Sequence, residues 1–400
     1  NGIIITDESF NVLSVINRNS GLKVNSVLSL MQDYQGNLWA CTDNGINQVY
    51  YSSPVSFYGP EAGITGNINT IKRYKGDLFF GTTDGLFILN QRSFDLKSTF
   101  IPYGGIFKEV RSLCLSDESL LVNTGNELYE IRNNETNRIV ASDINALHYS
   151  QKLKILFISG GNKFSLYRYS GNWNKIMDIP EITEDIVRIE EADNPEQITL
   201  WMGTMIDGIV RLKITSLSNY TVDKYHSADG LAEQTWVLPF SIDGKILFSQ
   251  SIGLLSFVDE KIIQAQLPDS LKNIPEFYRG YFEFSELGSS RKIVGKPVYY
   301  AEDTRDRIYV NLDGDLGYFD KRNNYSFERN AFALSYIGKI NVILHEDDRI
   351  CWIGGDDGLL RFDENGFKDY AVDFTALITR VSYGARSEEH TSELQSRQSI

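Results

Sequence analysis

One short pattern returns along almost the whole chain and limits what the chain can fold into. It contains two polar or turn residues, three or four apolar residues, a small residue, a glycine-containing turn and another apolar residue. The pattern occurs eight times, from NLWACTDNGI at residue 37 to ICWIGGDDGL at residue 350. The third position of each copy is a large apolar anchor: Trp39, Phe79, Leu121, Leu156, Trp201, Leu247, Tyr309 and Trp352.

The spacing of these anchors indicates the fold. Successive anchors lie 40, 42, 35, 45, 46, 62 and 43 residues apart. A period of about 40 to 50 residues built only from short strands is typical of a β-propeller, in which each repeat forms one four-stranded blade. We therefore predict an all-β fold, a β-propeller of four-stranded blades. One blade cannot bury both its faces, so the anchors are expected to pack between neighbouring blades.

The first complete copy predicts four strands, at residues 24–36, 37–46, 46–51 and 55–59. Each is a run of β-branched or bulky residues that ends at a turn signal. Residues 1–16 look like the third and fourth strands of a still earlier blade. Eight copies leave two arrangements open: one eight-bladed ring, or the end of one propeller followed by a complete seven-bladed one. The step of 62 residues predicts a protruding loop near 273–297.

Composition excludes several classes of protein. The 53 acidic and 39 basic residues give a net charge of −14, which repels a phosphate backbone, so nucleic acid is not an expected partner. No apolar run reaches the roughly 18 residues of a transmembrane helix, and the first residues lack the pattern of a secretion signal. Cys41, Cys114 and Cys351 have no metal or redox spacing and are expected to be small buried residues.

The sequence contains no recognisable catalytic constellation. There is no GxSxG, HExxH, glycine-rich phosphate loop or paired-cysteine metal site. His148, His226 and His345 have no nucleophile or carboxylate partner at a fixed spacing. The aspartates of LDGDLGYFD and GGDDGLL lack the ligand pattern of a calcium loop and read as turn residues. We therefore predict no catalytic residue, no metal and no cofactor.

Binding is the more plausible activity. In a propeller, the loops that join one blade to the next lie with the loops between second and third strands on one face, around the mouth of the central channel, where ligand sites can form. Trp236 is the sharpest candidate, because it falls outside the anchor series and an aromatic ring beside amides suits a sugar. The candidate ligand-binding residues, each at the start of an inner strand, are Asn25, Asn67, Lys108, Asp185, Gln234 and Trp236.

The repeat resembles that of the two-component regulator propellers. Residues 19–46, NSGLKVNSVLSLMQDYQGNLWACTDNGI, contain a Gly-Leu turn, an Asn, a strand and Asp-x-x-Gly-Asn-Leu-Trp, as the blades of that family do. Residues 229–254 and 339–362 are similar with a weaker consensus. The resemblance covers residues 1–370, the expected propeller repeats with a truncated first blade. Copies three, four and seven lack the Trp and the full Gly-Thr.

The chain after the last repeat adds a second resemblance. DYAVDFTALITRVSYG at 369–384 is similar to the entry into the triple-tyrosine, immunoglobulin-like domain of such sensors, so residues 371–385 are expected to begin that domain. Residues 386–400 begin RSEEHTSELQS, which resembles a translated sequencing adapter, and are expected to be non-native.

The family resemblance implies a function. It implies a periplasmic sensor region that binds a small molecule or oligosaccharide, signals through its own triple-tyrosine and kinase domains, and acts as a homodimer in the full-length protein. The fragment itself is then not an enzyme. The alternative is a propeller enzyme, a lyase or hydrolase of polysaccharide, that uses acids at the channel mouth and His226. Fold alone does not choose between the two.

Overall fold

The fold is given by a computed structural model. It describes residues 2–18, 21–33, 36–51, 53–90, 99–192, 197–206, 208–242, 244–250, 253–264, 300–312, 315–324, 326–329, 332, 337–347 and 349–366. The loop predicted at 273–297, the expected start of a triple-tyrosine domain at 371–385 and the tail at 386–400 lie outside these residues.

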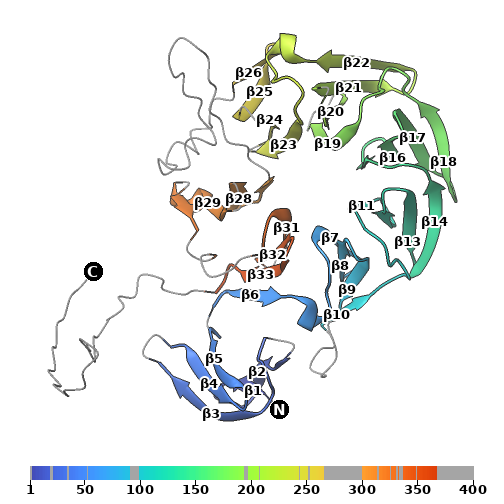
Figure 1. Ribbon diagram of the computed structural model, residues 1–400. Coiled ribbons are helices and arrows are strands. Elements are labelled where there is room, and N and C mark those ends of the chain that lie inside the picture. Colours follow the sequence, from blue (N-terminus) through green and yellow to red (C-terminus); the bar gives the residue numbers. More distant parts are fainter. Residues whose placement is uncertain are drawn as a thin grey trace, which may run out of the picture.

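Seven four-stranded antiparallel sheets form a ring in the described part of the chain (Figure 1). The first three blades are formed by β7 (Ile68–Tyr74), β8 (Asp77–Thr82), β9 (Leu86–Leu89) and β10 (Phe100–Pro102), then β11 (Ser112–Leu115), β12 (Leu120–Asn123), β13 (Glu127–Arg132) and β14 (Glu135–Ala141), then β15 (Ala146–Ser150), β16 (Ile155–Gly160), β17 (Lys163–Tyr169) and β18 (Trp173–Asp178).

The next three blades follow in the same order along the chain. They are formed by β19 (Ile186–Ala192), β20 (Ile198–Thr204), β21 (Ile209–Ser216) and β22 (Asn219–Tyr225), then β23 (Leu238–Ile242), β24 (Lys245–Gln250), β25 (Gly253–Val258) and β26 (Lys261–Gln264), then β27 (Tyr300–Asp303), β28 (Arg307–Leu312), β29 (Asp315–Asp320) and β30 (Ser326–Glu328). The seventh contains β31 (Ile340–His345), β32 (Ile350–Gly355), β33 (Gly358–Asp363) and β6 (Val55–Tyr58).

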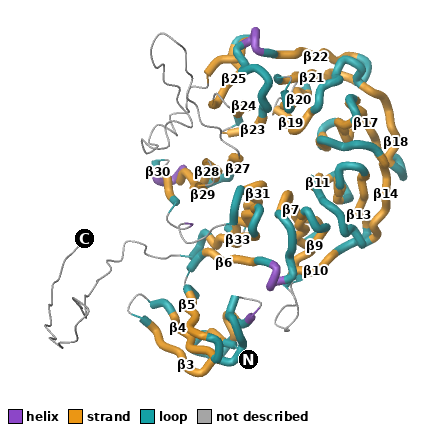
Figure 2. Tube along the Cα trace, in the orientation of Figure 1, coloured by secondary structure: helices purple, strands orange, loops and turns teal. Residues whose placement is uncertain are grey.

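The first strand of every blade lies innermost and touches the first strand of the next blade. Contacts run from β7 through β11, β15, β19, β23 and β27 to β31, and β31 in turn contacts β7. Among the described residues, the helical elements are single 3-10 turns, η2 (Pro60–Ala62), η3 (Ser227–Asp229) and η5 (Lys321–Asn323), drawn in purple in Figure 2. The architecture is therefore the predicted all-β propeller, with blades of four strands.

The ring is closed by a strand from its beginning. β6 pairs antiparallel with β33, from Val55 opposite Phe362 to Tyr58 opposite Leu359. The sequence analysis wrongly made residues 55–59 the fourth strand of the blade that holds Trp39. The sequence of a strand does not specify its partner, and here the strand pairs with β33, the edge strand of the last blade. Of the two arrangements left open, the structure excludes the eight-bladed ring, because two smaller sheets precede a complete seven-bladed ring.

Two smaller sheets precede the ring. One is the hairpin of β1 (Ile3–Thr6) and β2 (Val12–Ile16), and the other contains β3 (Val27–Gln32), β4 (Leu38–Thr42) and β5 (Gly45–Val49). They share a small apolar core that includes Ile3, Leu22 and Ala40. Leu28 and Leu30 of β3 are exposed, so this unit presents uncovered apolar surface.

The main core lies between blades. Trp352 of the seventh blade packs on Phe80 of the first blade, with ring centroids 5.8 Å apart, and on Tyr58 of β6 at 6.1 Å. Seven of the eight anchors lie on the second strand of a ring blade and are buried, while Trp39 on β4 of the smaller sheet is half-buried. Large apolar side chains at this position fill the space that two flat blades leave between them.

The Asp-x-x-Gly-Asn-Leu-Trp stretch of the smaller sheet builds a turn that fixes its own tryptophan. The Asp33 carboxylate accepts hydrogen bonds from the backbone N–H of Asn37 at 2.8 Å and from Trp39 Nε1 at 2.9 Å. Glu346 takes the same place in the last blade, where it accepts from Trp352 Nε1 at 2.8 Å and pairs with Arg73 of the first blade. An acidic residue at this turn therefore satisfies the buried indole N–H.

The Gly-Thr pair at the end of the second strand has two separate tasks. A Cβ on Gly81 would meet Val110 of the next blade, so only glycine allows this approach. The hydroxyl of Thr204 donates to the carbonyl oxygen of Gly208 at 2.9 Å and holds the turn that follows. The repeat thus encodes both the packing distance between blades and the loop at the channel mouth.

The packing of Trp352 predicts the effect of truncating it. Trp352→Ala removes a buried ring between the last and first blades, and the cavity should lower the free energy of unfolding by about 3–5 kcal/mol. Urea unfolding followed by circular dichroism measures the change. Ile176→Ala, on the outer strand β18 where Ile176 is 38% exposed, is the control and should change stability by less than about 0.5 kcal/mol. Equal losses in both variants would contradict the packing.

The closure by β6 predicts a contrast between two shortened chains. A chain that begins at Ser53 keeps β6 and should melt close to the temperature of the whole chain, apart from the transition of the smaller sheets. A chain that begins at Gly59 lacks β6, exposes the edge of β33, and should melt at least about 5 °C lower and self-associate. Calorimetry and light scattering measure both effects. Identical melting of the two chains would contradict the role given to β6.

Candidate functional site

Five of the six predicted ligand-binding residues lie on one face of the ring, in loops that lead into inner strands. Asn67 precedes β7, Lys108 precedes β11 and Asp185 precedes β19. Gln234 and Trp236 share the loop before β23.

Asn25 was wrongly assigned to this mouth. It precedes β3 in the smaller sheets, where its side-chain oxygen accepts from the backbone N–H of Arg18 at 2.7 Å. Its repeat is outside the closed ring, which the sequence pattern alone did not distinguish.

Asn67 joins the first and last blades. Its Nδ2 donates to Asp356 Oδ1 at 3.2 Å, and Asn341 Nδ2 donates to the same oxygen at 2.9 Å. Asp356 lies in the turn between β32 and β33, within the aspartate-rich GGDDGLL stretch. This carboxylate is therefore occupied by a contact between loops.

Lys108 belongs to a charged group on the second blade. Its Nζ pairs with the Glu127 carboxylate and donates to the Tyr129 hydroxyl at 3.1 Å, and Arg138 donates to Glu127 at 2.8 Å. The hydrogen bonds from Lys108, Arg138 and Tyr129 lower the pKa of Glu127 to about 2. A ligand that used Lys108 would have to compete with this carboxylate.

The loop around Trp236 presents the clearest surface for a ligand on this face. The backbone N–H of Val237 donates to the Thr204 carbonyl oxygen at 3.0 Å, which brings Trp236 next to Met205. Met205 is 53% exposed and Ile206 60% exposed, whereas Trp236 is half-buried. A half-buried tryptophan, with the exposed Gln234 in its own loop and exposed apolar side chains in the adjoining loop, can hold a sugar face and its hydroxyl groups.

The other mouth residue, Asp185, lies one blade away from this loop. Its carboxylate accepts from Asn145 Nδ2 at 3.2 Å, and its carbonyl oxygen accepts from the Met205 backbone N–H at 3.3 Å. The structure thus brings Asp185, Met205 and Trp236 into neighbouring loops, while Lys108 and Asn67 lie on other blades.

The histidines have structural surroundings. His148 Nε2 lies 2.8 Å from Glu191 on the inner strand of the next blade, and the backbone N–H of His226 donates to Asp229 at 2.8 Å. Among the described residues, no three His, Cys, Asp or Glu side chains are grouped so that they could hold a metal ion. The described residues also include no helix with the length and apolar character needed to cross a membrane.

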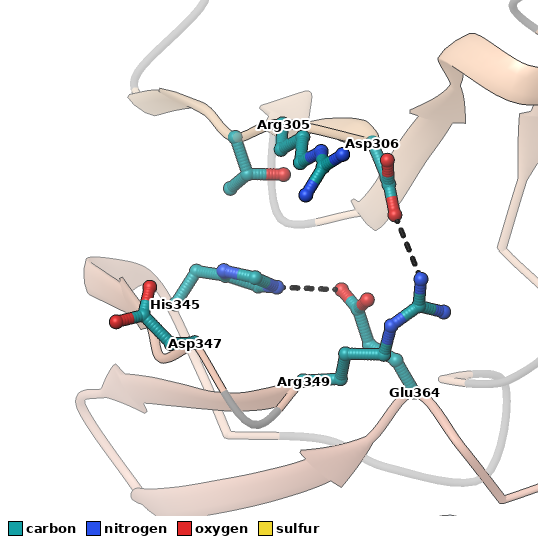
Figure 3. Close-up of a pocket in the computed structure, with 7 residues that line it drawn as sticks. Arg305, Asp306, His345, Asp347, Arg349 and Glu364 are labelled. Carbon is teal, nitrogen blue, oxygen red and sulfur yellow. Dashed lines mark hydrogen bonds and ion pairs between the residues drawn. The ribbon is translucent and has the colours of Figure 1, made fainter.

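A cavity of about 460 Å³ lies on the opposite face, between the sixth and seventh blades (Figure 3). Thr304, Arg305 and Asp306 come from the turn between β27 and β28. Across from them are His345 at the end of β31 and residues of the following turn, with Glu364 directly after β33.

Glu364 is the electrostatic centre of this site. Its side chain is 1% exposed, and its carboxylate lies 3.2 Å from both Arg307 Nη1 and His345 Nε2. The Tyr309 hydroxyl donates to the same carboxylate. Burial, then the neighbouring Cys351 and Glu364, raise the pKa of Tyr309 far above its usual value, so its hydroxyl keeps the proton that it donates.

A second pair crosses the same cavity. Asp306 of the sixth blade lies 3.1 Å from Arg349 Nη2 of the seventh and 3.5 Å from Arg322 Nη1. Figure 3 shows the Asp306–Arg349 and His345–Glu364 pairs, with Asp347 at the far end beside His345. Charged side chains from both blades therefore meet in one partly enclosed space.

Sequence reasoning missed this site because its residues come from two repeats and form no motif. His345 was expected to have no catalytic partner, and the turns DTRDR and HEDDR were given no role. The available signal was that two consecutive repeats carry four charged residues each in and directly beside the turn between the first and second strands, in DTRDR and HEDDR.

The fold and its loop faces define a class of protein, a seven-bladed β-propeller, here preceded by two smaller sheets. Residues 21–44 match the family model described as "Two component regulator propeller", so the resemblance seen in the repeat is confirmed for these residues. They form β3 and β4 and the turns that flank them, including the Asp33–Trp39 turn. No curated protein sequence matches the chain significantly.

Two solved structures from B. thetaiotaomicron share the fold. The extracellular domain of the putative hybrid two component system BT3049 has a TM-score of 0.66 at 14% identity, with 98% of this chain and 53% of that chain covered. The corresponding domain of the putative hybrid two component system BT4673 has a TM-score of 0.57 at 15% identity, with 90% and 48% covered. The chain thus spans about half the length of these structures.

The buried position of Glu364 predicts a loss of stability when its charge is removed. Glu364→Gln leaves the Arg307 guanidinium, 8% exposed, without its carboxylate, which should lower the free energy of unfolding by about 3 kcal/mol. Urea unfolding at neutral pH measures the change. Asp347→Asn, an exposed carboxylate at the same cavity, is the control and should have an effect below about 0.5 kcal/mol. An unaffected Glu364→Gln variant would contradict the charge network.

Proposed function

We propose that this chain is the ligand-sensing part of a bacterial two-component signalling protein, outside the cytoplasm, and that it is not itself an enzyme. The match of residues 21–44 to the regulator propeller model supports this proposal, as does the fold shared with extracellular domains of two such systems. In a Gram-negative cell the domain would be periplasmic. Its expected partners are its own triple-tyrosine domain, beginning at 371–385, and a kinase, in a homodimer.

The observation that carries the binding proposal is the surface around Trp236. Trp236 lies in a loop that the Val237–Thr204 backbone hydrogen bond joins to the loop of the exposed Met205 and Ile206. Aromatic and apolar side chains on a rigid scaffold bind the apolar face of a sugar at little cost in conformational entropy. We therefore propose an oligosaccharide or another small nutrient as the ligand at this face.

Signalling would follow from a change in the position of the whole ring relative to the domains after it. The blades pack on one another through buried side chains, and the β6–β33 pairing closes the ring, so ligand binding would move the ring as a rigid body and not open it. This mechanism needs no reaction at the site.

Truncation of Trp236 tests the binding face. We expect Trp236→Ala to weaken the affinity for an oligosaccharide that binds the wild-type chain by about tenfold or more, with unchanged melting temperature. Titration calorimetry with a panel of defined neutral oligosaccharides measures the affinity, and Ile176→Ala is the control on the outer strand. Unchanged affinity in Trp236→Ala would remove this loop from the site.

The enzyme alternative is tested with the same panel. The purified chain is incubated with polysaccharides and oligosaccharides, and the release of reducing ends or unsaturated products is followed. Turnover that disappears in His226→Ala would overturn the non-catalytic proposal, because a binding module releases its ligand unchanged.

A further inference from the structure

One arginine that lines the cavity between the sixth and seventh blades is not paired with a carboxylate among the described residues. Arg305 and Arg349 line the cavity, Arg307 lies behind it against Glu364, and Arg322 contacts Asp306 from the side. Four guanidinium groups therefore lie in or beside this cavity, in a chain with a net charge of −14.

Two of the three carboxylates that line the cavity are engaged by cationic side chains. Glu364 is paired with Arg307 and His345, and Asp306 is paired with Arg349 and Arg322. Neither is left as a free negative charge that would repel an anion. The remaining carboxylate, Asp347, lies at the end of the group, beside His345 (Figure 3).

Arg305 is the group left over. Its side chain reaches toward the space above His345 and Glu364 in Figure 3, and within the described part of the chain no hydrogen bond or ion pair engages its guanidinium. An arginine that is already aimed into a cavity with no partner can form two parallel hydrogen bonds to a planar oxyanion.

The neighbouring groups suit the rest of such a ligand. Arg349 uses one terminal nitrogen for Asp306, and the exposed Asp347 can accept hydrogen bonds from hydroxyl groups. The Thr304 hydroxyl donates to the Arg307 carbonyl oxygen at 2.8 Å and accepts from the Arg307 backbone N–H at 3.1 Å, so toward a ligand it can act only as a further acceptor. The volume of about 460 Å³ is within the usual range for small-molecule sites. A monosaccharide-sized molecule with one oxyanion fits this combination of charge and polarity.

We propose that this cavity is a second ligand site, which binds a small polyhydroxylated oxyanion through Arg305. The carboxylate of a sugar acid and the phosphate of a sugar phosphate share the necessary chemistry. The site is distinct from the Trp236 surface, because its residues come from turns at the opposite ends of the strands. Its occupant would contact both the sixth and seventh blades next to the end of β33.

The test uses the whole chain and calorimetric titration at low, fixed ionic strength, because screening weakens contacts with exposed charges. The probes are galacturonate, its neutral counterpart galactose, and inorganic phosphate. The variants are Arg305→Gln, Arg305→Lys, Trp236→Ala and, as the matched control, Arg168→Gln, which removes an exposed arginine from β17 of the third blade.

We expect galacturonate to bind at least about tenfold more tightly than galactose, and Arg305→Gln to weaken its binding by about tenfold or more. Arg305→Lys should restore part of the affinity because it keeps the charge and loses the paired geometry. Arg168→Gln and Trp236→Ala should bind galacturonate like the wild type. Phosphate binding with the same dependence on Arg305, without galacturonate binding, would assign the site to the phosphate class.

Two results would overturn the proposal. One is the failure of both galacturonate and phosphate to bind the wild-type chain. The other is binding that Arg305→Gln leaves unchanged, since the oxyanion would then be held elsewhere. Because Arg305 is exposed and has no hydrogen-bond or ion-pair partner among the described residues, its variants should melt with the wild type, which separates loss of binding from loss of fold. Neither result bears on the proposal for the Trp236 surface, because that proposal is tested with neutral oligosaccharides.

Discussion

The pairing of β6 with β33 is the contact on which the rest of the ring depends. Six blades are formed by strands that follow one another in sequence, so their strand pairing does not depend on how many blades the ring has. The seventh takes its outer strand from residues about 300 positions earlier, Val55–Tyr58. This borrowed strand covers an edge that would otherwise be open, and it places Tyr58 against Trp352 at the junction of the last and first blades.

Within this closed ring, the repeated residues act at the boundaries between blades. Gly81 allows close approach of the next blade, the Thr204 hydroxyl fixes a mouth loop, and Glu346 holds Trp352 while pairing with Arg73 of the first blade. Because the core is shared between neighbours, no blade has an independent core. Each mouth loop is therefore positioned by two blades, which makes the ring a rigid support for loops of variable sequence.

Sequence alone was sufficient for the features that repeat. The anchors at Trp201 and Trp352, the four-stranded blades and the identity of the inner strands follow from a period that is visible in single letters. Sequence reasoning failed for residues 55–59, VSFYG, because local sequence indicates that a segment is a strand but does not indicate which strand it pairs with. It failed for Asn25 for the same reason, since membership of the ring depends on that pairing. The cavity near Glu364 was missed because two separate turns create it.

Because β6 belongs to the seventh blade, this blade is the one through which the chain enters the ring. The smaller sheets lead into β6, and β33 is the last described strand, so both connections enter or leave the seventh blade (Figure 1). On the mouth face this blade is tied to the first by Asn67 and Asp356, and on the opposite face it is tied to the sixth through Glu364. A ligand at either boundary of this blade would act on the part of the ring that bears both connections, whereas binding at blades two to five would have to act through the ring as a rigid body.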